Sequence, residues 1–371
     1  MRTRLLVAIA ALAVVGAACA NTGASPSPAA SPSPAASAPA SPESPAASPA
    51  ESPAGGIPPA SELKIGMITD IGQLEDKSFN EFSWKGVQEG AKAIGAPEPQ
   101  VIVTRDIADY AQNIREFADQ GYHVIVTVGF LIGTDTRRAA LQYPNIQFFG
   151  VDQFVADPAP PNYQGLLFNE AQSGYLAGIV AGTITKTGII GAVGGRSDVP
   201  PVPAFINGYK NGAASVKPDV KVLVQYTQDF NAPDKGEASA KAMIQQKADV
   251  IFQVAGLTGA GALRAACDAG IWGIGVDVDQ YLSLPDAAQC IVTSAEKKLT
   301  NAVSQAIQRF ASQGYQSGNL INDAKNDGIG LAPIRNITPP ADLQAKIDEA
   351  FNAMKAGTLD PCQPIACDTV P

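Results

Sequence analysis

The chain has 371 residues, and its 35 Asp and Glu residues outnumber its 26 Lys and Arg residues, which gives a formal net charge of −9. Such an acidic chain lacks the basic face that the phosphates of a nucleic acid require, so we expect no nucleic-acid partner. Its one histidine, His123, excludes sites built from several histidines and argues against a Ser-His-Asp enzyme. We therefore expect neither a metal nor a cofactor.

The N-terminus has the pattern of an export signal. Arg2 and Arg4 precede a short apolar run, and small residues lead to Cys19. The run is too short to span a bilayer, which takes about 20 apolar residues, so residues 1–18 are predicted to be a signal peptide. Cys19 resembles the lipid-modified cysteine of a bacterial lipobox; the alternative is an ordinary signal with an incidental cysteine. Residues 19–60, rich in Ala, Ser and Pro, are predicted to be a disordered tether.

From residue 64 onward, apolar strand-like runs alternate with segments of helical periodicity. The predicted strands are 64–69, 101–104, 123–128, 146–151, 164–168, 189–195, 220–226, 249–254, 272–276, 291–293 and 328–331. The predicted helices are 78–93, 108–120, 136–142, 173–184, 201–215, 235–247, 259–269, 296–313 and 340–355.

This alternation predicts an α/β protein with parallel sheets that are covered by helices on both faces. The pattern breaks near residue 168 into two blocks, so we expect two lobes. The first would comprise residues 61–168, with about 291–322 crossing back to it, and the second residues 169–290 with about 323–371. In open α/β sheets a ligand lies at the carboxyl ends of the strands, which places it in a cleft between the lobes.

Four cysteines remain in the body of the chain: Cys267, Cys290, Cys362 and Cys367. An even number in an exported chain suggests two disulfides, for which three pairings are possible. Proximity in the sequence favours Cys267–Cys290 and Cys362–Cys367. A zinc site is the alternative, but the usual Cys-x2-Cys spacing is missing.

Polar residues follow the first strand and open the first helix. Asp70 ends the strand, and Asp76 and Ser78 precede the helix, where either side chain is suited to capping its N-terminus. Phe79 has two interpretations, as part of the core or as part of a site. Asn80 follows it.

Three further places combine polar or glycine residues with a strand end. Gly256 lies in a glycine-rich turn before a helix, which suggests close helix–strand contact more than a phosphate cradle. Asp277 and Asp279 are suited to an acid/base couple, a cation site or the binding of sugar hydroxyls. Lys297 is predicted to open a helix, where its charge opposes the helix dipole, and is either functional or a solvated surface lysine.

Five segments in this order carry a resemblance to a known family. They are DKSFNEFSWKG from Asp76, SGYLAGIVAG from Ser173, TKTGIIGAVGG from Thr185, GVDVDQ from Gly275 and TSAEKK from Thr293. Together they resemble the basic membrane protein family, also called the purine nucleoside receptor lipoproteins, from about residue 63 to residue 355. The resemblance implies a substrate-binding protein of an ABC-type importer with the two-lobed fold of periplasmic binding proteins.

The resemblance also implies a role for each residue singled out above. Members of the family hold a nucleoside in the cleft, with the base stacked on aromatic rings and the ribose bound by carboxylates and a lysine. The residues that match are Asp70 and Asn80 near the base, Phe79 as a stacking ring, Gly256 in the turn near the sugar, and Asp277 and Lys297 facing the ribose. Asp152, at the end of the fourth strand, is a further candidate. The second stacking ring stays open between Phe252, Phe205 and Phe230.

The sequence therefore predicts a monomeric, lipid-anchored binding protein on the extracytoplasmic face of the cell membrane. It would close on a small ligand, a purine nucleoside by resemblance, and deliver it to a membrane permease without catalysing a reaction. One alternative is a receptor of the same fold for a sugar or another heterocycle. A second is an exported nucleoside-cleaving enzyme with a cation held by Asp70, Asp76, Asp277 and Asp279. An adhesive surface protein is a third.

Overall fold

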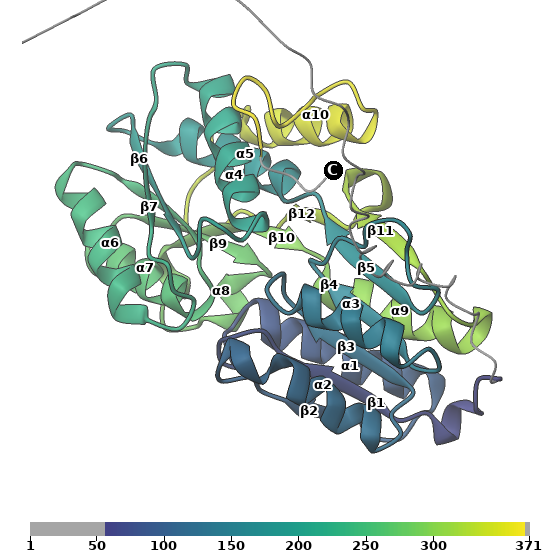
Figure 1. Ribbon diagram of the computed structural model, residues 1–371. Helices are drawn as coiled ribbons and strands as arrows, with labels where there is room; N and C mark the ends of the chain where they lie inside the picture. The colour runs from purple at the N-terminus through teal and green to yellow at the C-terminus, as the bar shows by residue number, and fades with distance from the viewer. Residues whose placement is uncertain (1–55, 368–371) are drawn as a thin grey trace, which may run out of the picture. The chain divides into compact units, whose positions relative to one another are not determined.

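The computed structural model describes residues 56–367, which form two sheets with helices around them (Figure 1). The predicted signal peptide, Cys19 and nearly all of the predicted tether lie outside the described residues. Among residues 56–367, none of the helices combines the length and the apolar character needed to cross a membrane.

The first sheet is parallel throughout and defines the N-terminal lobe. Its strand order is β11-β5-β4-β3-β1-β2. The strands are β1 (Ile65–Ile68), β2 (Gln100–Ile102), β3 (Val124–Val128), β4 (Gln147–Val151), β5 (Tyr163–Phe168) and β11 (Gly318–Asn322).

The second sheet defines the C-terminal lobe and has the order β12-β10-β9-β8-β6-β7. All its neighbours are parallel except β10 and β12, which are antiparallel. The strands are β6 (Ile189–Gly194), β7 (Lys221–Tyr226), β8 (Val250–Val254), β9 (Trp272–Asp277), β10 (Ile291–Lys297) and β12 (Ile329–Leu331). The prediction of a two-lobed α/β protein with mostly parallel sheets is confirmed.

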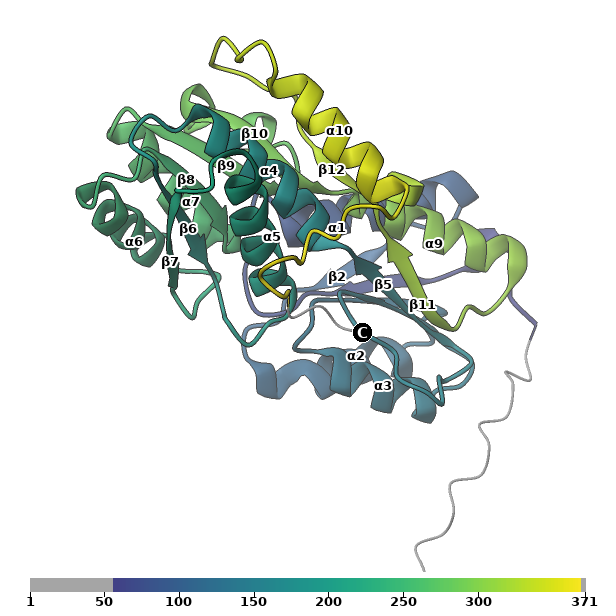
Figure 2. The ribbon, with the colours of Figure 1, turned by 90° about the horizontal axis from the view of Figure 1, so that it is seen from above.

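Both sheets are buried on both faces, which is why their central strands are continuously apolar. In the N-terminal lobe, Val126 faces a core shared with α1 and α9, whereas Ile125 faces a core shared with α2 and α3 (Figure 2). In the C-terminal lobe, Ile190 faces α4 and α5 and Ile251 faces α6 and α7. The α-helices are α1 (Phe79–Ile94), α2 (Tyr110–Asp119), α3 (Gly133–Gln142), α4 (Glu170–Ile184), α5 (Pro201–Val216), α6 (Pro233–Gln245), α7 (Gly256–Asp268), α8 (Gln280–Ser283), α9 (Leu299–Gln313) and α10 (Leu343–Lys355). Short 3-10 turns span Ala60–Glu62, Ile107–Asp109, Ala288–Cys290 and Ala324–Asn326.

In the described part of the chain, the backbone crosses between the lobes three times: after β5, after β10 and after β11. These crossings are hydrogen-bonded to one another. The Asn169 N–H donates to the Asn322 carbonyl over 2.9 Å, and the Lys298 N–H donates to the Gly328 carbonyl over 3.0 Å. The lobes are therefore joined by a compact hinge.

The structure corrects the predicted return to the first lobe at about residue 291. Strand β10 continues to Lys297 and pairs with β9 in the second sheet, from Ile291 opposite Gly273 to Glu296 opposite Asp277. The return begins only with α9. A local pattern resembling a helix start at residue 296 is overridden because pairing with β9 satisfies the backbone of the whole segment.

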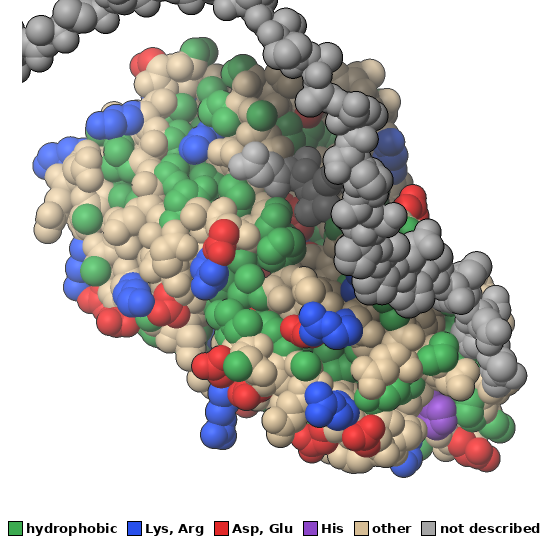
Figure 3. Space-filling model, viewed as in Figure 1, with side chains coloured by type: hydrophobic (Ala, Val, Ile, Leu, Met, Phe, Trp, Pro, Cys, Tyr) green, Lys and Arg blue, Asp and Glu red, His purple; other side chains and the backbone are tan. Residues whose placement is uncertain are grey.

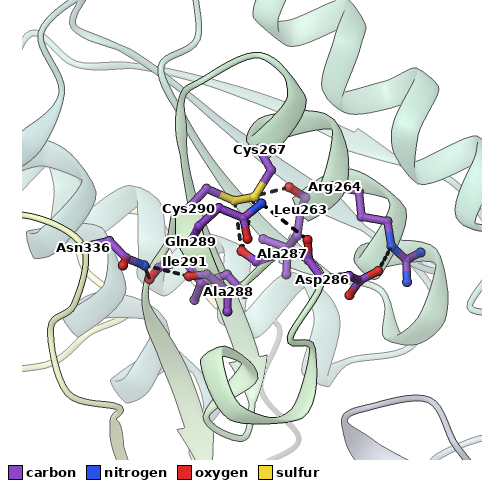
Figure 4. Close-up of a disulfide and its surroundings, with 10 residues drawn as sticks. All are labelled: Leu263, Arg264, Cys267, Asp286, Ala287, Ala288, Gln289, Cys290, Ile291 and Asn336. Carbon is purple, nitrogen blue, oxygen red and sulfur yellow. Dashed lines mark hydrogen bonds and ion pairs between the residues drawn. A yellow bond between two sulfur atoms is a disulfide. The ribbon is translucent and has the colours of Figure 1, made fainter.

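Of the three possible ways to pair the four cysteines, the structure contains the one in which both disulfides are local in sequence. Cys267, near the end of α7, is bonded to Cys290, with Cα atoms 5.3 Å apart (Figure 4). Cys362 is bonded to Cys367, with Cα atoms 5.0 Å apart. Asn211 on α5 holds this second loop, because its Nδ2 donates to the carbonyl of Pro361 over 2.8 Å.

Candidate functional site

A cavity of about 90 Å³ lies where the carboxyl ends of strands from both sheets face each other. The structure brings together in its walls all six residues that the resemblance assigns to the ligand, and Asp152 with them: Asp70, Phe79, Asn80, Asp152, Gly256, Asp277 and Lys297. These residues come from both lobes. The cavity is thus a compartment between the lobes, at the position expected for a ligand in sheets of this kind.

On the N-terminal side, Asp70 is fixed by its own lobe. Its Oδ1 accepts hydrogen bonds from the Ile71 N–H at 2.6 Å and from the Tyr110 hydroxyl, and its Oδ2 accepts from the Leu131 N–H at 3.1 Å. Burial raises the pKa of Asp70, although these donors favour its charged form. Gly129, with φ of 108°, lies so close to Asp70 that a Cβ there would collide with the carboxylate.

Asp76 caps α1, as predicted. Its carboxylate accepts from the backbone N–H groups of Ser78, Asn80 and Glu81 at 3.0, 2.9 and 3.2 Å. Burial raises the pKa of Asp76 to about 7 despite these three donors. Ser78 occupies the N-cap position, but its side chain makes no capping hydrogen bond; its hydroxyl donates across to Asp277 Oδ2 on the C-terminal lobe, over 2.7 Å.

Phe79 and Asn80 project from the first turn of α1 into the cavity. Phe79 is half-buried, so part of its ring remains open to the cavity. The amide nitrogen of Asn80 donates to the Gln73 carbonyl over 3.1 Å, while its Oδ1 is buried without a partner. Asp152 Oδ1 is likewise buried without a partner. Because unpaired buried acceptors are costly, two groups in these walls are suited to hydrogen-bond donors of a ligand.

On the C-terminal side, Asp277 ends β9 and has a φ of 64°, in the left-handed region. Asp152, at the end of β4, has a φ of 59°. Such backbone conformations are unfavourable for residues other than glycine and concentrate at functional sites. The second carboxylate of the predicted pair, Asp279, is not in the cavity wall and forms an ion pair with Arg335, at 2.7 Å. The four-aspartate cluster of the enzyme alternative is therefore incomplete.

Gly256 opens α7 with a φ of 54° and lines the cavity. Two glycines after it, Gly259 and Gly261, are so close to Gln253 and to the Pro233 carbonyl that a Cβ at either position would collide. This geometry agrees with the prediction that the glycines of this turn allow close contact between helix and strand, in preference to a phosphate site. Among residues 56–367, no group of three or more His, Cys, Asp and Glu side chains is arranged to hold a metal ion.

Lys297 is not the first residue of a helix, and it is not solvated. It ends β10 with its side chain 2 % exposed. Its ammonium lies 2.6 Å from Asp152 Oδ2 and 2.9 Å from Glu170 Oε1. Three rings surround it, with centroids 5.2 to 5.5 Å from Nζ: Phe79, Phe168 and Phe205. Burial disfavours the charged ammonium, but the three carboxylates Asp152, Glu170 and Asp277 together raise the pKa of Lys297 above its ordinary value.

The same burial acts on the carboxylates around the ammonium. Desolvation raises the pKa of Asp152 and of Asp277, and the charge of Lys297 only partly offsets it. The pKa of Glu170 is also raised, to about 7. Desolvation and repulsion from Asp152 raise it, and the attraction of Lys297 offsets them only in part.

The three candidates for the second stacking ring differ in whether they line the cavity. Phe252 does not line the cavity: it is fully buried behind it, with its ring centroid 6.3 Å from that of Phe205 and 4.9 Å from that of Tyr209. The suggestion that Phe252 stacks on the ligand is therefore wrong. Phe205 and Phe230 both line the cavity from the C-terminal lobe.

Sequence reasoning missed two residues at this site. Tyr110, which holds Asp70, lies on a helix that gave no signal beyond its apolar period. Glu170 had a signal: it is an acidic residue at the start of a helix that is otherwise largely apolar, three residues before the segment that begins at Ser173. A charge in such a helix requires a buried partner.

Comparison with known proteins matches this arrangement. The family described as ABC transporter substrate-binding protein, PnrA-like, matches residues 63–355. The chain is 31 % identical over 290 residues to a Lactococcus lactis subsp. cremoris protein named ABC transporter nucleoside-binding protein BmpA, covering 73 % of this chain and 82 % of that one. It is 30 % identical over 271 residues to basic membrane protein A of Borreliella burgdorferi, covering 72 % and 78 %.

Solved structures show the same fold. An ABC transporter solute-binding protein from Aeropyrum pernix superimposes with a TM-score of 0.73 at 23 % identity, over 80 % of this chain and 92 % of that chain. A second, from Conexibacter woesei, gives a TM-score of 0.64 at 26 % identity, over 80 % and 98 %. Fold and sequence thus agree over the whole two-lobed body. The chain belongs to the family of PnrA-like ABC transporter substrate-binding proteins.

Proposed function

We propose that the protein captures a purine nucleoside in the cavity between its lobes and delivers it to a membrane permease. The observation that carries this proposal is the combination of aromatic rings from both lobes with buried, strand-end carboxylates and a lysine around one cavity between the lobes. A nucleoside likewise has two parts, a flat aromatic base and a sugar rich in hydroxyl groups. The aromatic rings of the cavity suit the base, and its charged side chains suit the sugar. A relative 31 % identical is named a nucleoside-binding protein.

Each half of the ligand has suitable partners. The base stacks on Phe79 of the N-terminal lobe and on Phe205 or Phe230 of the C-terminal lobe, a contact worth about 1–3 kcal/mol per ring. Asp70 and the free Oδ1 of Asn80 accept hydrogen bonds from the edge of the base. Asp277 and Asp152 accept from the ribose hydroxyls and Lys297 donates to them, in a site from which water is excluded.

The protein acts outside the cytoplasm on a lipid anchor. The signal at residues 1–18 directs export, Cys19 carries the lipid, and residues 19–60 hold the binding body away from the membrane. The body works as a monomer that closes about its hinge and docks on the permease. Replacement Cys19→Ser is expected to move the protein from the membrane fraction to the soluble fraction, and a protein that stays membrane-bound would contradict the anchor.

The test of the ligand is a thermal-shift screen of the purified protein against nucleosides, free bases, sugars and amino acids. A ligand that binds only the folded state stabilises it by about 2.7 kcal/mol at a hundredfold excess over Kd. We expect a clear rise in Tm with inosine, guanosine or adenosine and none with ribose alone. A rise only with sugars would favour a sugar receptor of the same fold, and a rise only with amino acids would remove the nucleoside site.

A further inference from the structure

Glu170 is a buried acid next to the cavity but not in its wall. It is the first residue of α4, directly after the first crossing between the lobes. Its side chain is 7 % exposed, and its Oε1 lies 2.9 Å from the ammonium of Lys297. Lys297 in turn is the last residue of β10, directly before the second crossing. One ion pair therefore joins two strands of the hinge.

The ammonium of Lys297 has two carboxylate partners from different parts of the chain. Asp152 belongs to the N-terminal lobe and lines the cavity, whereas Glu170 belongs to the crossing and does not. A lysine side chain is long and flexible, so one partner alone would leave its head free to rotate about that partner. Two partners, with the rings of Phe79, Phe168 and Phe205 around it, fix the direction of its N–H groups.

We propose that Glu170 is a positioning residue, which holds the ammonium of Lys297 so that it faces the sugar end of the ligand and leaves Asp152 Oδ1 free to accept from the ligand. The inference rests on the proposed function for the nature of that ligand. It assigns to Glu170 no contact with the ligand, and makes its charge a condition of tight binding through Lys297.

The charged groups around Glu170 determine how this effect depends on pH. Lys297 on β10 faces Glu170 directly, Asp152 on β4 shares that lysine, and Asp277 on β9 acts on the same lysine from the cavity side. Burial and the nearby Asp152 raise the pKa of Glu170 to about 7, so its protonation falls within an accessible range. A protonated Glu170 resembles a glutamine in charge and shape.

The experiment compares Glu170→Gln with the wild type and with Glu296→Gln. Glu296 is the matched control because it lies on β10 beside Lys297, but its carboxylate pairs with Lys298 at 2.5 Å and is not in the cavity wall. Affinities for inosine and for its free base hypoxanthine are measured by calorimetry from pH 5.5 to pH 8.

At pH 8 we expect Glu170→Gln to bind inosine about tenfold more weakly than the wild type, which is the lower end of the loss found when the outer hydrogen-bond partner of a metal ligand is removed. Binding of hypoxanthine, which has no sugar, is expected to be unchanged. At pH 5.5 the difference for inosine is expected to disappear, since wild-type Glu170 is then protonated. Asp277 acts through the same lysine in both proteins, whereas Asp152, which repels Glu170, is expected to titrate at a lower pH in Glu170→Gln. Equal inosine affinities at pH 8, or a tenfold loss that persists at pH 5.5, would overturn the inference.

A second measurement needs no ligand. With ¹⁵N-labelled lysine, the ammonium of Lys297, assigned by its loss in Lys297→Met, is expected to give a slowly exchanging NMR signal in the wild type and in Glu296→Gln but not in Glu170→Gln. An unchanged signal in Glu170→Gln would contradict the positioning role. Loss of the signal together with no binding of nucleosides by the wild type would keep the positioning role and reject the proposed ligand. If Glu170→Gln does not fold, Glu170→Asp, which keeps the charge but shortens the reach, is expected to lose the signal as well.

Discussion

The two walls of the cavity are built differently. On the N-terminal wall, Asp70 and Asp76 take their hydrogen bonds from their own lobe, through Tyr110 and five backbone N–H groups in total. On the C-terminal wall, Asp277 and Lys297 take theirs from the other lobe or from the hinge, through Ser78, Asp152 and Glu170. The N-terminal wall can therefore keep its shape when the lobes separate, whereas the C-terminal wall completes its contacts only on closure.

This difference suggests an order of binding. A ligand that arrives at the open protein meets preformed groups on the N-terminal wall, around Phe79. In the proposed closure, Asp277 and Lys297 would then reach the ligand, and the contacts between the lobes would add to the contacts with the ligand. On the face seen in Figure 3, basic side chains are scattered among acidic and apolar ones.

The largest effect is expected from Lys297→Met. The change leaves Asp152 and Glu170 buried without a cation, and breaking a buried pair in this way costs about 3–5 kcal/mol of unfolding free energy. Urea denaturation measures the loss. The control is Lys298→Met, since Lys298 is partly exposed and pairs only with Glu296 near the surface, which is worth about 0–1 kcal/mol. Equal losses in the two variants would show that the ion pairs of Lys297 with Asp152 and Glu170 do not stabilise the fold.

The next effect concerns binding by the C-terminal wall. Asp277→Ala is expected to weaken nucleoside binding by about 1.5–3 kcal/mol, the range for a hydrogen bond to a charged group, while the protein stays folded. Calorimetry with inosine measures the change. Asp279→Ala is the matched control, because Asp279 lies two residues away and pairs with Arg335 outside the cavity. Unchanged affinity in Asp277→Ala would remove Asp277 from the site.

The buried acids are expected to make stability depend on pH in an unusual direction. The pKa of Asp76 is raised from 3.8, and that of Glu170 from 4.5, to about 7 in the folded protein. Between about pH 4.5 and 7 the folded state therefore holds protons that the unfolded chain has released, so the free energy of unfolding falls as pH rises through this window.

The expected change for the ligand-free protein is on the order of 2 kcal/mol for each of the two groups between pH 5 and pH 7.5, measured by urea denaturation. In Glu170→Gln the slope should be smaller, because one of the titrating groups is gone. Greater stability at pH 7.5 than at pH 5 would mean that these carboxylates stay charged when buried.

The smallest effect is expected at the contact between the walls. Ser78→Ala removes the hydrogen bond to Asp277 Oδ2 but no group that is assigned to the ligand. The free energy of closure should therefore become less favourable by about 1 kcal/mol, and the affinity for inosine should fall about fivefold. Small-angle scattering of the ligand-free protein is expected to show a larger radius of gyration. Ser312→Ala is the control, since its hydroxyl bonds only within α9 at the surface. Identical behaviour of the two variants would argue against closure through Ser78.

Most of the fold could be predicted from the sequence because buried parallel strands and amphipathic helices have distinct periods. Two strand segments differ from the prediction, and in both the sequence preference for a strand is weak. Strand β11 (Gly318–Asn322) was not predicted because it is a short edge strand with alternating exposure, next to glycine. Lys297 was placed on a helix because the preference of a polar strand end is weak compared with its pairing in the sheet.

At the site, the residue types were predictable but not every direction of a side chain. Asp70, Phe79 and Asp277 follow strand ends or open a helix, and those places are visible in the sequence. Phe252 and Phe205 could not be told apart, because the choice depends on which face of β8 meets α5. The ion pair of Glu170 could not be predicted because its partner, Lys297, is 127 residues away in the sequence, at a different crossing.

The three hydrogen-bonded crossings between the lobes have a mechanical consequence. A single flexible linker would let one lobe twist and tilt freely, whereas three short connections tied side by side leave essentially one axis of rotation. In the proposed closure, each reopening would return the two walls along the same arc. Little orientational freedom is lost on closing, so most of the contact energy between ligand and protein remains available as affinity.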